Sequence, residues 1–161
     1  MKKEVEISPG LNCEEGQCEV ESNSLSASEA NEEEVSDNRL IYVGDPMCSW
    51  CWGITNHLDR LIEEFDGQLS FELILGGLRP GGGDQWTHEF REMLRSHWEH
   101  VHEASGQPFD HAFFERKEFN YDTEPSSRAV RVIRDIVPEK EWPFYKSLQR
   151  MFYSRIEIFR I

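Results

Sequence analysis

The sequence has no apolar stretch long enough to cross a membrane, and its first 38 residues lack the apolar core of a secretory signal peptide. It also lacks basic character: 17 Lys and Arg stand against 31 Asp and Glu, a net charge of −14, which disfavours nucleic acid or an anionic membrane as partner. Cysteine is scarce, with four residues. These absences predict a cytoplasmic protein, and because structural disulfides are rare there, the cysteines are candidates for catalysis, redox sensing or metal binding.

Residues 1–38 also lack aromatic side chains, and they hold eleven Asp and Glu against two lysines. Such a segment buries too little apolar surface to fold, so it is predicted to be a disordered acidic tail. Cys13 and Cys18 lie within it. They are a possible accessory dithiol or, with Cys48 and Cys51, the ligands of a zinc ion; the simpler alternative is two inert thiols.

The stretch around Cys48 predicts a strand, a turn and a helix in direct succession. Leu40–Val43 has the β-branched and aromatic content of a buried strand, and Gly44-Asp45-Pro46 ends it. The following apolar residues share one helix face: Ile54, Leu58, Leu61, Ile62 and Phe65. The pair Cys48 and Cys51 therefore opens a helix just beyond the carboxyl end of a strand.

This placement supports thiol chemistry, because free N–H groups and the helix dipole stabilise a thiolate at a first helical turn. Cys48 is expected to have a lowered pKa and to act as the nucleophile. Cys51, one turn on, is within bridging reach and is expected to resolve mixed disulfides. The alternative for the same spacing is half of a structural zinc site.

The remaining elements predict a βαβ unit followed by helices. Residues 69–75 are expected to form a second strand, parallel to the first. A glycine-rich loop at 76–83, predicted to be a flexible connection, leads into three helices within about residues 84 to 153. His97, His100 and His102 fall on the first of these helices, where a solvated face is a better interpretation than a metal site. Phe109, Phe113, Phe114 and Phe119 are predicted to pack in a core.

The run Asp45–Gly53 (DPMCSWCWG) resembles the active-site segment of the DsbA-like branch of the thioredoxin superfamily. It is most similar to the protein-disulfide isomerases related to FrnE. The stretches Gly76–Pro80 and Tyr121–Pro125 also resemble that group, in the same order. The resemblance covers about residues 39 to 153.

The resemblance implies an α/β thioredoxin-like fold interrupted by a helical insertion, and a disulfide oxidase or isomerase that needs no cofactor. Cys48 and Cys51 would be its catalytic groups, with Ser49, Trp50 and Pro46 tuning the redox potential or facing substrate. The implied partners are protein thiols and disulfides, with glutathione or a thioredoxin-type protein as reductant.

The end of the chain departs from the family pattern. The family continues with a proline-containing antiparallel hairpin and a closing helix, but only nine residues follow Phe152. Their alternation suits one edge strand, so residues 39–161 are expected to form a partial domain truncated at its C-terminus. An inactive fragment is therefore one alternative function, beside the zinc module. A glutathione-using enzyme similar to kappa-class transferases is disfavoured, because those carry a serine-based site.

Overall fold

The computed structural model describes residues 13–14, 17–18 and 38–154, in two units, Met1–Glu34 and Val35–Ile161. In the first unit, β1 (Cys13–Glu14) pairs antiparallel with β2 (Gln17–Cys18), and Cys13 is the register partner of Cys18. Of the other residues of the predicted acidic tail, Asn38 is described, and its carbonyl accepts from the Ser70 N–H at 3.0 Å; the rest lie outside the described part. Its disorder therefore stays a prediction.

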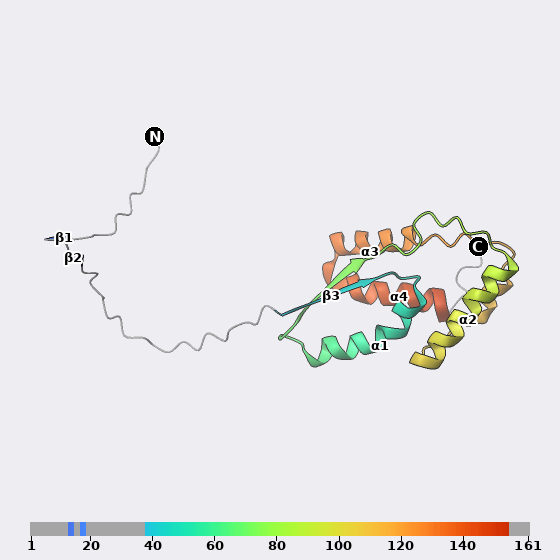
Figure 1. The fold of residues 1–161 in the computed structure, drawn as a ribbon, viewed down its shortest axis with the longest axis horizontal. Coiled ribbons are helices and arrows are strands. Elements are labelled where there is room, and N and C mark those ends of the chain that lie inside the picture. The colour runs from blue at the N-terminus through green and yellow to red at the C-terminus, as the bar shows by residue number, and fades with distance from the viewer. Residues whose placement is uncertain (1–12, 15–16, 19–37, 155–161) are drawn as a thin grey trace, which may run out of the picture. The chain divides into compact units, whose positions relative to one another are not determined.

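The second unit is an α/β structure that begins with the predicted βαβ motif (Figure 1). β3 (Arg39–Gly44) leads into α1 (Ser49–Glu64), which returns the chain to β4 (Ser70–Leu75). The two strands are parallel, in register from Arg39 opposite Ser70 to Gly44 opposite Leu75. The predicted strands and their parallel pairing are confirmed, and α1 begins beyond the carboxyl end of β3.

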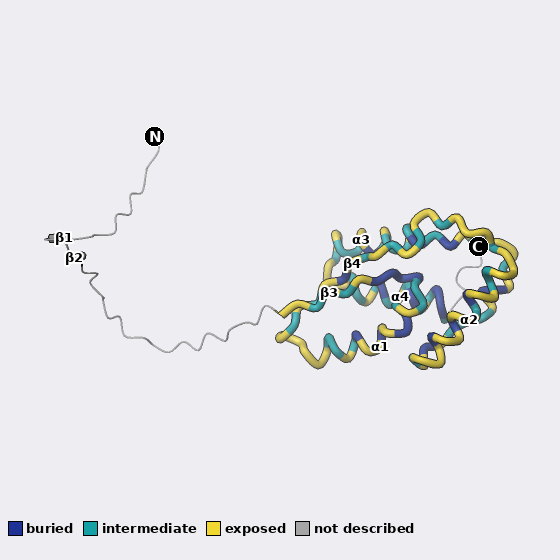
Figure 2. Tube along the Cα trace, viewed as in Figure 1, coloured by how far each residue is buried: buried dark blue, intermediate teal, exposed yellow. Residues whose placement is uncertain are grey.

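One face of this sheet is covered by α3 (Glu124–Ile136) and α4 (Glu141–Ser154), which are joined by the short helix η2 (Pro138–Lys140). The sheet cluster consists of Leu73, Val130 and Tyr145, all buried, with Tyr42 and Phe71 packed against them. The side chains that alternate with these point away from the helices. Ile41, Val43 and Ile74 are 46%, 60% and 40% exposed, and Figure 2 shows this alternation of exposed and half-buried positions along β3.

The helical part of the unit is held together by aromatic side chains. α2 (His88–Ser105) and the 3₁₀ helix η1 (His111–Glu115) pack with α1 and the end of α4. Trp98, 1% exposed, lies at the centre, with the ring centroids of Phe113, Phe114 and Tyr153 at 5.1, 4.7 and 5.1 Å. The predicted aromatic core is therefore confirmed. We call its buried members the aromatic cluster: Met47, Trp52, Leu94, Trp98, Phe113, Phe114, Tyr121, Phe152 and Tyr153.

The last described helix is longer than the sequence predicts. Tyr153 and Ser154, assigned above to a terminal strand, form the final residues of α4. Tyr153 is fully buried and stacks on Trp52 with a centroid distance of 6.2 Å, so tertiary packing favours the helical conformation there. Residues 155–161, the rest of the predicted edge strand, lie outside the described part.

The glycine-rich loop after β4 is anchored rather than a free connection. The Arg79 N–H donates to Thr123 Oγ1 at 3.0 Å, and the Thr123 N–H donates to the Arg79 carbonyl at 3.1 Å. The Gly81 N–H donates to Asp122 Oδ1 at 2.8 Å. The two stretches that resemble the family outside the CxxC segment, Gly76–Pro80 and Tyr121–Pro125, are thus tied together. Their contact holds the loop against the start of α3.

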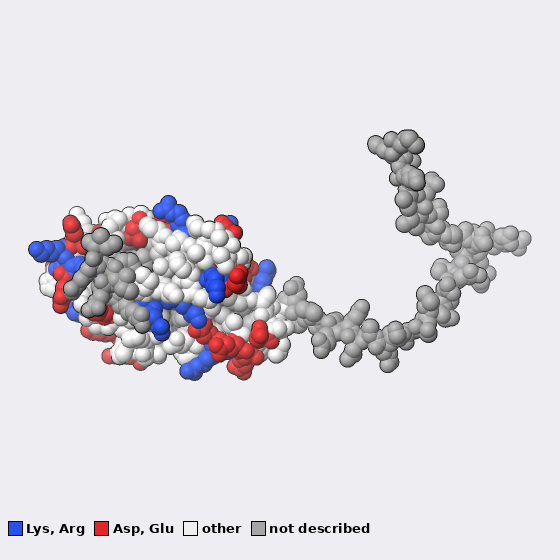
Figure 3. Space-filling view, turned by 180° about the vertical axis from the view of Figure 1, so that it is seen from behind, with Lys and Arg blue, Asp and Glu red and all other residues white. Residues whose placement is uncertain are grey.

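Charged side chains of both signs are interspersed on the described part of the face in Figure 3. Exposed pairs such as Arg131 with Asp135 contribute little to stability, but Lys146 of α4 reaches Asp59 of α1 at 2.8 Å in a partly buried pair. This pair ties α4 to α1. Within the described residues, no helix combines the length and the apolar character that a membrane span requires.

Candidate active site

The turn before the CxxC motif is buried and its polar groups are paired. The Asp45 carboxylate accepts from the Met47 N–H through Oδ1 and from the Leu78 N–H through Oδ2, both at 2.8 Å. The Tyr145 hydroxyl donates to the Asp45 carbonyl at 3.1 Å, and the Tyr121 hydroxyl donates to the Met47 carbonyl at 2.5 Å. Groups from three distant elements therefore fix the backbone that carries Cys48.

Cys48 is the N-cap residue of α1, and Cys51 lies in the first helical turn. The Cys48 backbone is extended, its N–H donates to the Asp45 carbonyl at 3.1 Å, and its own carbonyl accepts from the Trp52 N–H at 3.0 Å. Both cysteines are half-buried free thiols. The predicted position of the pair, at the beginning of a helix after a strand, is confirmed.

The two thiols share protons as a pair. A hydrogen bond with the Cys48 thiol lowers the pKa of Cys51 to about 6, with smaller contributions from Tyr42 and Tyr145 against the opposing effect of burial. The same hydrogen bond, followed by burial, raises the pKa of Cys48 well above its ordinary value. Such a pair loses its first proton easily and its second with difficulty. It therefore contains one reactive thiolate near neutral pH.

The expectation that the pKa of Cys48 is lowered is wrong for the free dithiol. The backbone N–H groups of Trp50 and Cys51 do favour a Cys48 thiolate, as a helix start should. Their effect is smaller than that of the thiol–thiol hydrogen bond and of burial. The helix dipole can be inferred from the local sequence, but the hydrogen bond from the neighbouring thiol cannot, and it has the larger effect on the pKa.

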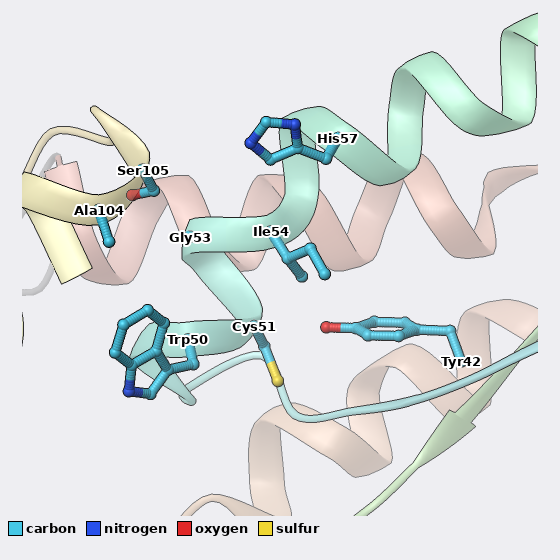
Figure 4. Close-up of a pocket in the computed structure, with 8 residues that line it drawn as sticks. All are labelled: Tyr42, Trp50, Cys51, Gly53, Ile54, His57, Ala104 and Ser105. Atoms are coloured by element: carbon cyan, nitrogen blue, oxygen red, sulfur yellow. The ribbon is translucent and has the colours of Figure 1, made fainter.

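A largely apolar pocket of about 430 Å³ lies beside Cys51, as Figure 4 shows. Its wall includes Trp50 and Ile54 of α1, Tyr42 of β3, and Ala104 and Ser105 of α2. Trp50 is 56% exposed, so it presents an apolar surface next to the dithiol. Trp52 belongs instead to the aromatic cluster, where its Nε1–H donates to the Pro108 carbonyl at 3.1 Å.

The other predicted site residues differ in how far they are buried and in how near they lie to the dithiol. Ser49 is half-buried at the first position of α1. Pro46 is fully buried, so it shapes the turn and does not offer a surface to substrate as predicted, because Tyr145 and the aromatic cluster pack around this turn. Cys13 and Cys18 belong to the other unit. Within the described residues, no group of three or more His, Cys, Asp or Glu could hold a metal ion.

Sequence reasoning assigned no role to three residues that interact with Cys51 or with the turn before Cys48: Tyr42, Asp45 and Tyr145. Tyr42 has a local signal, because it lies two residues before the end of a strand that points at the CxxC turn. Asp45 has a local signal too, as the residue before Pro46. Tyr145 lies 94 positions after Cys51 in the chain, and its helical pattern marks it only as a core residue.

Comparison with protein-family models finds no match, and no curated protein matches the chain. Solved structures do match. A candidate protein disulfide isomerase from Nitrosomonas europaea has a TM-score of 0.62 and 37% identity, over 73% of this chain and 56% of that one. The cytosolic disulfide reductase DsbM from Pseudomonas aeruginosa, solved with and without GSH, has TM-scores of 0.59 and identities of 24% and 23%.

The DsbM matches cover 71% of this chain and 55% and 54% of theirs. At these identities they bear on the fold alone. This chain thus spans little more than half the length of the solved structures that it matches. The predicted α/β, thioredoxin-like fold is confirmed.

Proposed function

Because this chain resembles DsbA-like thioredoxin-fold proteins, we propose that it is a thiol–disulfide oxidoreductase acting through Cys48 and Cys51. The observation that carries the proposal is the pair of free thiols at the start of α1, one of which has a pKa lowered to about 6. A thiolate is the nucleophile in disulfide exchange, and a second thiol one turn away can resolve the product. The 37% identity with a candidate disulfide isomerase supports this choice.

In the proposed reduction of a substrate, the Cys48 thiolate attacks one sulfur of the substrate disulfide. A Cys48–substrate bond forms, the substrate S–S bond breaks, and the other substrate sulfur leaves as a thiolate that takes up a proton. Cys51 then attacks the Cys48 sulfur, which releases the second substrate thiol and leaves an oxidised Cys48–Cys51 pair. Oxidation of a substrate dithiol runs through the same steps in reverse.

We assign the attacking role to Cys48 because the Trp50 and Cys51 N–H groups face its sulfur and stabilise the thiolate whenever the shared proton resides on Cys51. The thiolate with the higher proton affinity is also the stronger nucleophile. Ser49 and Trp50 between the cysteines supply no cationic donor, so we propose a less extreme thiolate than in strong oxidants of this class.

The proposed substrates are protein thiols and disulfides, with the exposed Trp50 as an apolar contact for unfolded segments. Glutathione or a thioredoxin-type protein is the proposed reductant; DsbM, which has the same fold, has been solved with GSH. Oxidase, isomerase and reductase use the same dithiol and differ in the redox state that the cell maintains. A cytoplasmic location stays part of the proposal.

Redox cycling of the purified full chain tests this function. Glutathione disulfide should convert the reduced protein to a Cys48–Cys51 disulfide, detected by peptide mapping, and dithiothreitol should restore both thiols. Cys48→Ser should abolish exchange, whereas Cys51→Ser should accumulate a glutathione adduct on Cys48. A chain that forms no Cys48–Cys51 disulfide and no adduct would be the inactive alternative.

Recovery of activity from a scrambled disulfide protein tests the proposed substrate class. Cycling with glutathione needs only access to the dithiol, whereas a protein substrate also needs a surface beside it. Full activity with glutathione but none with the scrambled protein would limit the function to small thiols. Cys48→Ser serves as the control for uncatalysed reshuffling.

The sequence also leaves a zinc-binding module of Cys13, Cys18, Cys48 and Cys51 as an alternative, which no group of described residues supports. Metal analysis of the protein purified without chelator distinguishes the two functions. The binding module would be favoured over the enzyme if the protein held one zinc per chain and if Cys13→Ser and Cys51→Ser each lost it.

A further inference from the structure

Tyr42 lies where the sheet meets the dithiol. It is on β3, two residues before Gly44, and its ring extends over the end of the strand toward α1. Figure 4 shows its hydroxyl directed at the sulfur of Cys51. Gly44 allows this approach: a Cβ there would lie 2.6 Å from a ring carbon of Tyr42 and 2.7 Å from the Tyr145 hydroxyl.

The Tyr42 hydroxyl is buried and makes no hydrogen bond of ordinary length and angle to any described residue. The side chains within its hydrogen-bonding reach are the Cys51 thiol and the Tyr145 hydroxyl, and Cys48 acts on it only through its charge. A buried hydroxyl without a firm partner costs free energy, so its position calls for an explanation. A negative charge on Cys51 would give it an acceptor.

The other titratable side chains around Cys51 are less suited than Tyr42 to donate a hydrogen bond to a Cys51 thiolate. Tyr145 of α4 also faces Cys51, but its hydrogen is donated to the Asp45 carbonyl. The Asp45 carboxylate is occupied by two backbone N–H groups. His57 is exposed and lies on the far side of the pocket from the sulfur, and α2 contributes the uncharged Ala104 and Ser105 (Figure 4).

We propose that Tyr42 is the hydrogen-bond donor that stabilises the Cys51 thiolate while Cys48 is held in a mixed disulfide. In the free dithiol, the Cys48 thiol supplies the main hydrogen bond to Cys51. In the mixed disulfide, Cys48 has no proton to donate, and the Tyr42 hydroxyl becomes the main remaining donor to Cys51, ahead of the Asp45 backbone N–H. Burial, and then the interaction with Cys51, raises the pKa of Tyr42 well above its ordinary value, so the phenol keeps its proton throughout. The inference rests on the proposed function.

The step balances without a further reactant. The Cys51 thiol loses its proton to solvent, and its thiolate accepts a hydrogen bond from Tyr42. The thiolate attacks the Cys48 sulfur; the Cys48–Cys51 bond forms, the Cys48–substrate bond breaks, and the substrate thiolate takes up a proton from solvent. Tyr42 transfers no proton, so its effect is on the pKa and nucleophilicity of Cys51.

The test is the variant Tyr42→Phe, which removes the hydroxyl and keeps the ring. In a chain with Cys13→Ser, Cys18→Ser and Cys48→Ala, where position 48 has no proton to donate, the pH dependence of Cys51 alkylation should shift upward by about one unit, as expected for loss of a hydrogen bond to a charged group. The matched control is Tyr153→Phe, because Tyr153 has another buried hydroxyl with no ordinary hydrogen bond to any described residue. That control should leave the Cys51 alkylation profile unchanged.

A second measurement follows the lifetime of the Cys48–glutathione adduct, by acid quench and mass spectrometry, with Cys48 and Cys51 present. Below the Cys51 pKa, Tyr42→Phe should slow resolution about threefold, because fewer Cys51 side chains are ionised. Well above it, resolution should be about threefold faster, because a more basic thiolate is a better nucleophile. The two pH–rate curves should therefore cross, which a merely structural defect would not produce.

Parallel pH–rate curves, or an unchanged Cys51 alkylation profile, would overturn the role of Tyr42. A shift of equal size in Tyr153→Phe would also overturn it, because the effect would then belong to the core and not to this hydroxyl. Failure of the proposed function would give a different result: no glutathione adduct would form in any variant, while the alkylation profile of Cys51 could still be measured. The two failures are thus distinguishable.

Discussion

The aromatic cluster and the sheet cluster differ in how completely their apolar side chains are buried. The aromatic cluster buries nine residues from α1, α2, η1, α4 and two loops, and Trp98 contacts the rings of Phe113, Phe114 and Tyr153. The sheet cluster buries three, and the opposite face of the described sheet exposes Ile41, Val43 and Ile74. The helical region therefore has a core that is buried on its own, whereas the described sheet is covered by helices on one face only. The dithiol is next to both regions.

Trp98→Ala should lower the free energy of unfolding more than any other substitution proposed here. Removing the central ring leaves a large cavity in the aromatic cluster, and such substitutions cost about 3–5 kcal/mol. Urea unfolding should show that loss as a lower midpoint. The matched control is Trp50→Ala, where the side chain is 56% exposed and the change should stay within about 0.5 kcal/mol. Equal losses in the two variants would contradict the described packing.

Leu73→Ala and Ile74→Ala compare the two faces of β4 at adjacent positions. Leu73 is 1% exposed and Ile74 is 40% exposed. The first substitution should cost about 2–5 kcal/mol and the second much less, because only the first removes a fully buried side chain. The same urea titration measures both. A larger loss for Ile74→Ala would show that the outer face is covered in solution, which would remove the contrast between the clusters.

The dithiol should make the stability of the reduced chain depend on pH. The pKa of Cys51 falls from 9.0 to about 6 on folding, so its contribution is present above pH 9 and is lost as the pH falls through 6. The pKa of Cys48 is raised, so its contribution is present below pH 9 and is lost as the pH rises further. The free energy of unfolding should therefore rise between about pH 6 and 9. Chemical denaturation at several pH values should show this rise, and Cys51→Ala should lack it.

Deleting residues 1–38 should have the smallest effect. That segment has no aromatic residue and a strong acidic excess, so its sequence offers little surface for packing against either cluster. The thermal transition and helix content should be nearly unchanged. A substantial fall in melting temperature would show that the segment stabilises the second unit, and it would give Cys13 and Cys18 a stronger claim to an accessory role.

Local patterns were sufficient to predict the elements and the position of the dithiol. The apolar run of β3, the break at Gly44-Asp45-Pro46 and the helical spacing from Ile54 place Cys48 and Cys51 at a helix start, because each signal acts over a few residues. Tyr153 shows the limit of such patterns. Its local alternation suits a strand, but stacking on Trp52 places it in α4.

The sequence by itself determined that two cysteines open a helix after a buried strand, and hence that thiol chemistry is available. Only the tertiary structure decided how their protons are shared, because that depends first on the hydrogen bond between the two thiols and then on the hydroxyls of Tyr42 from β3 and Tyr145 from α4. It also decided that Pro46 is buried and that Trp50 is exposed, since these outcomes depend on which helices cover the turn. Electrostatic effects on a thiol depend on distances in space, and residues far apart in the chain set those distances.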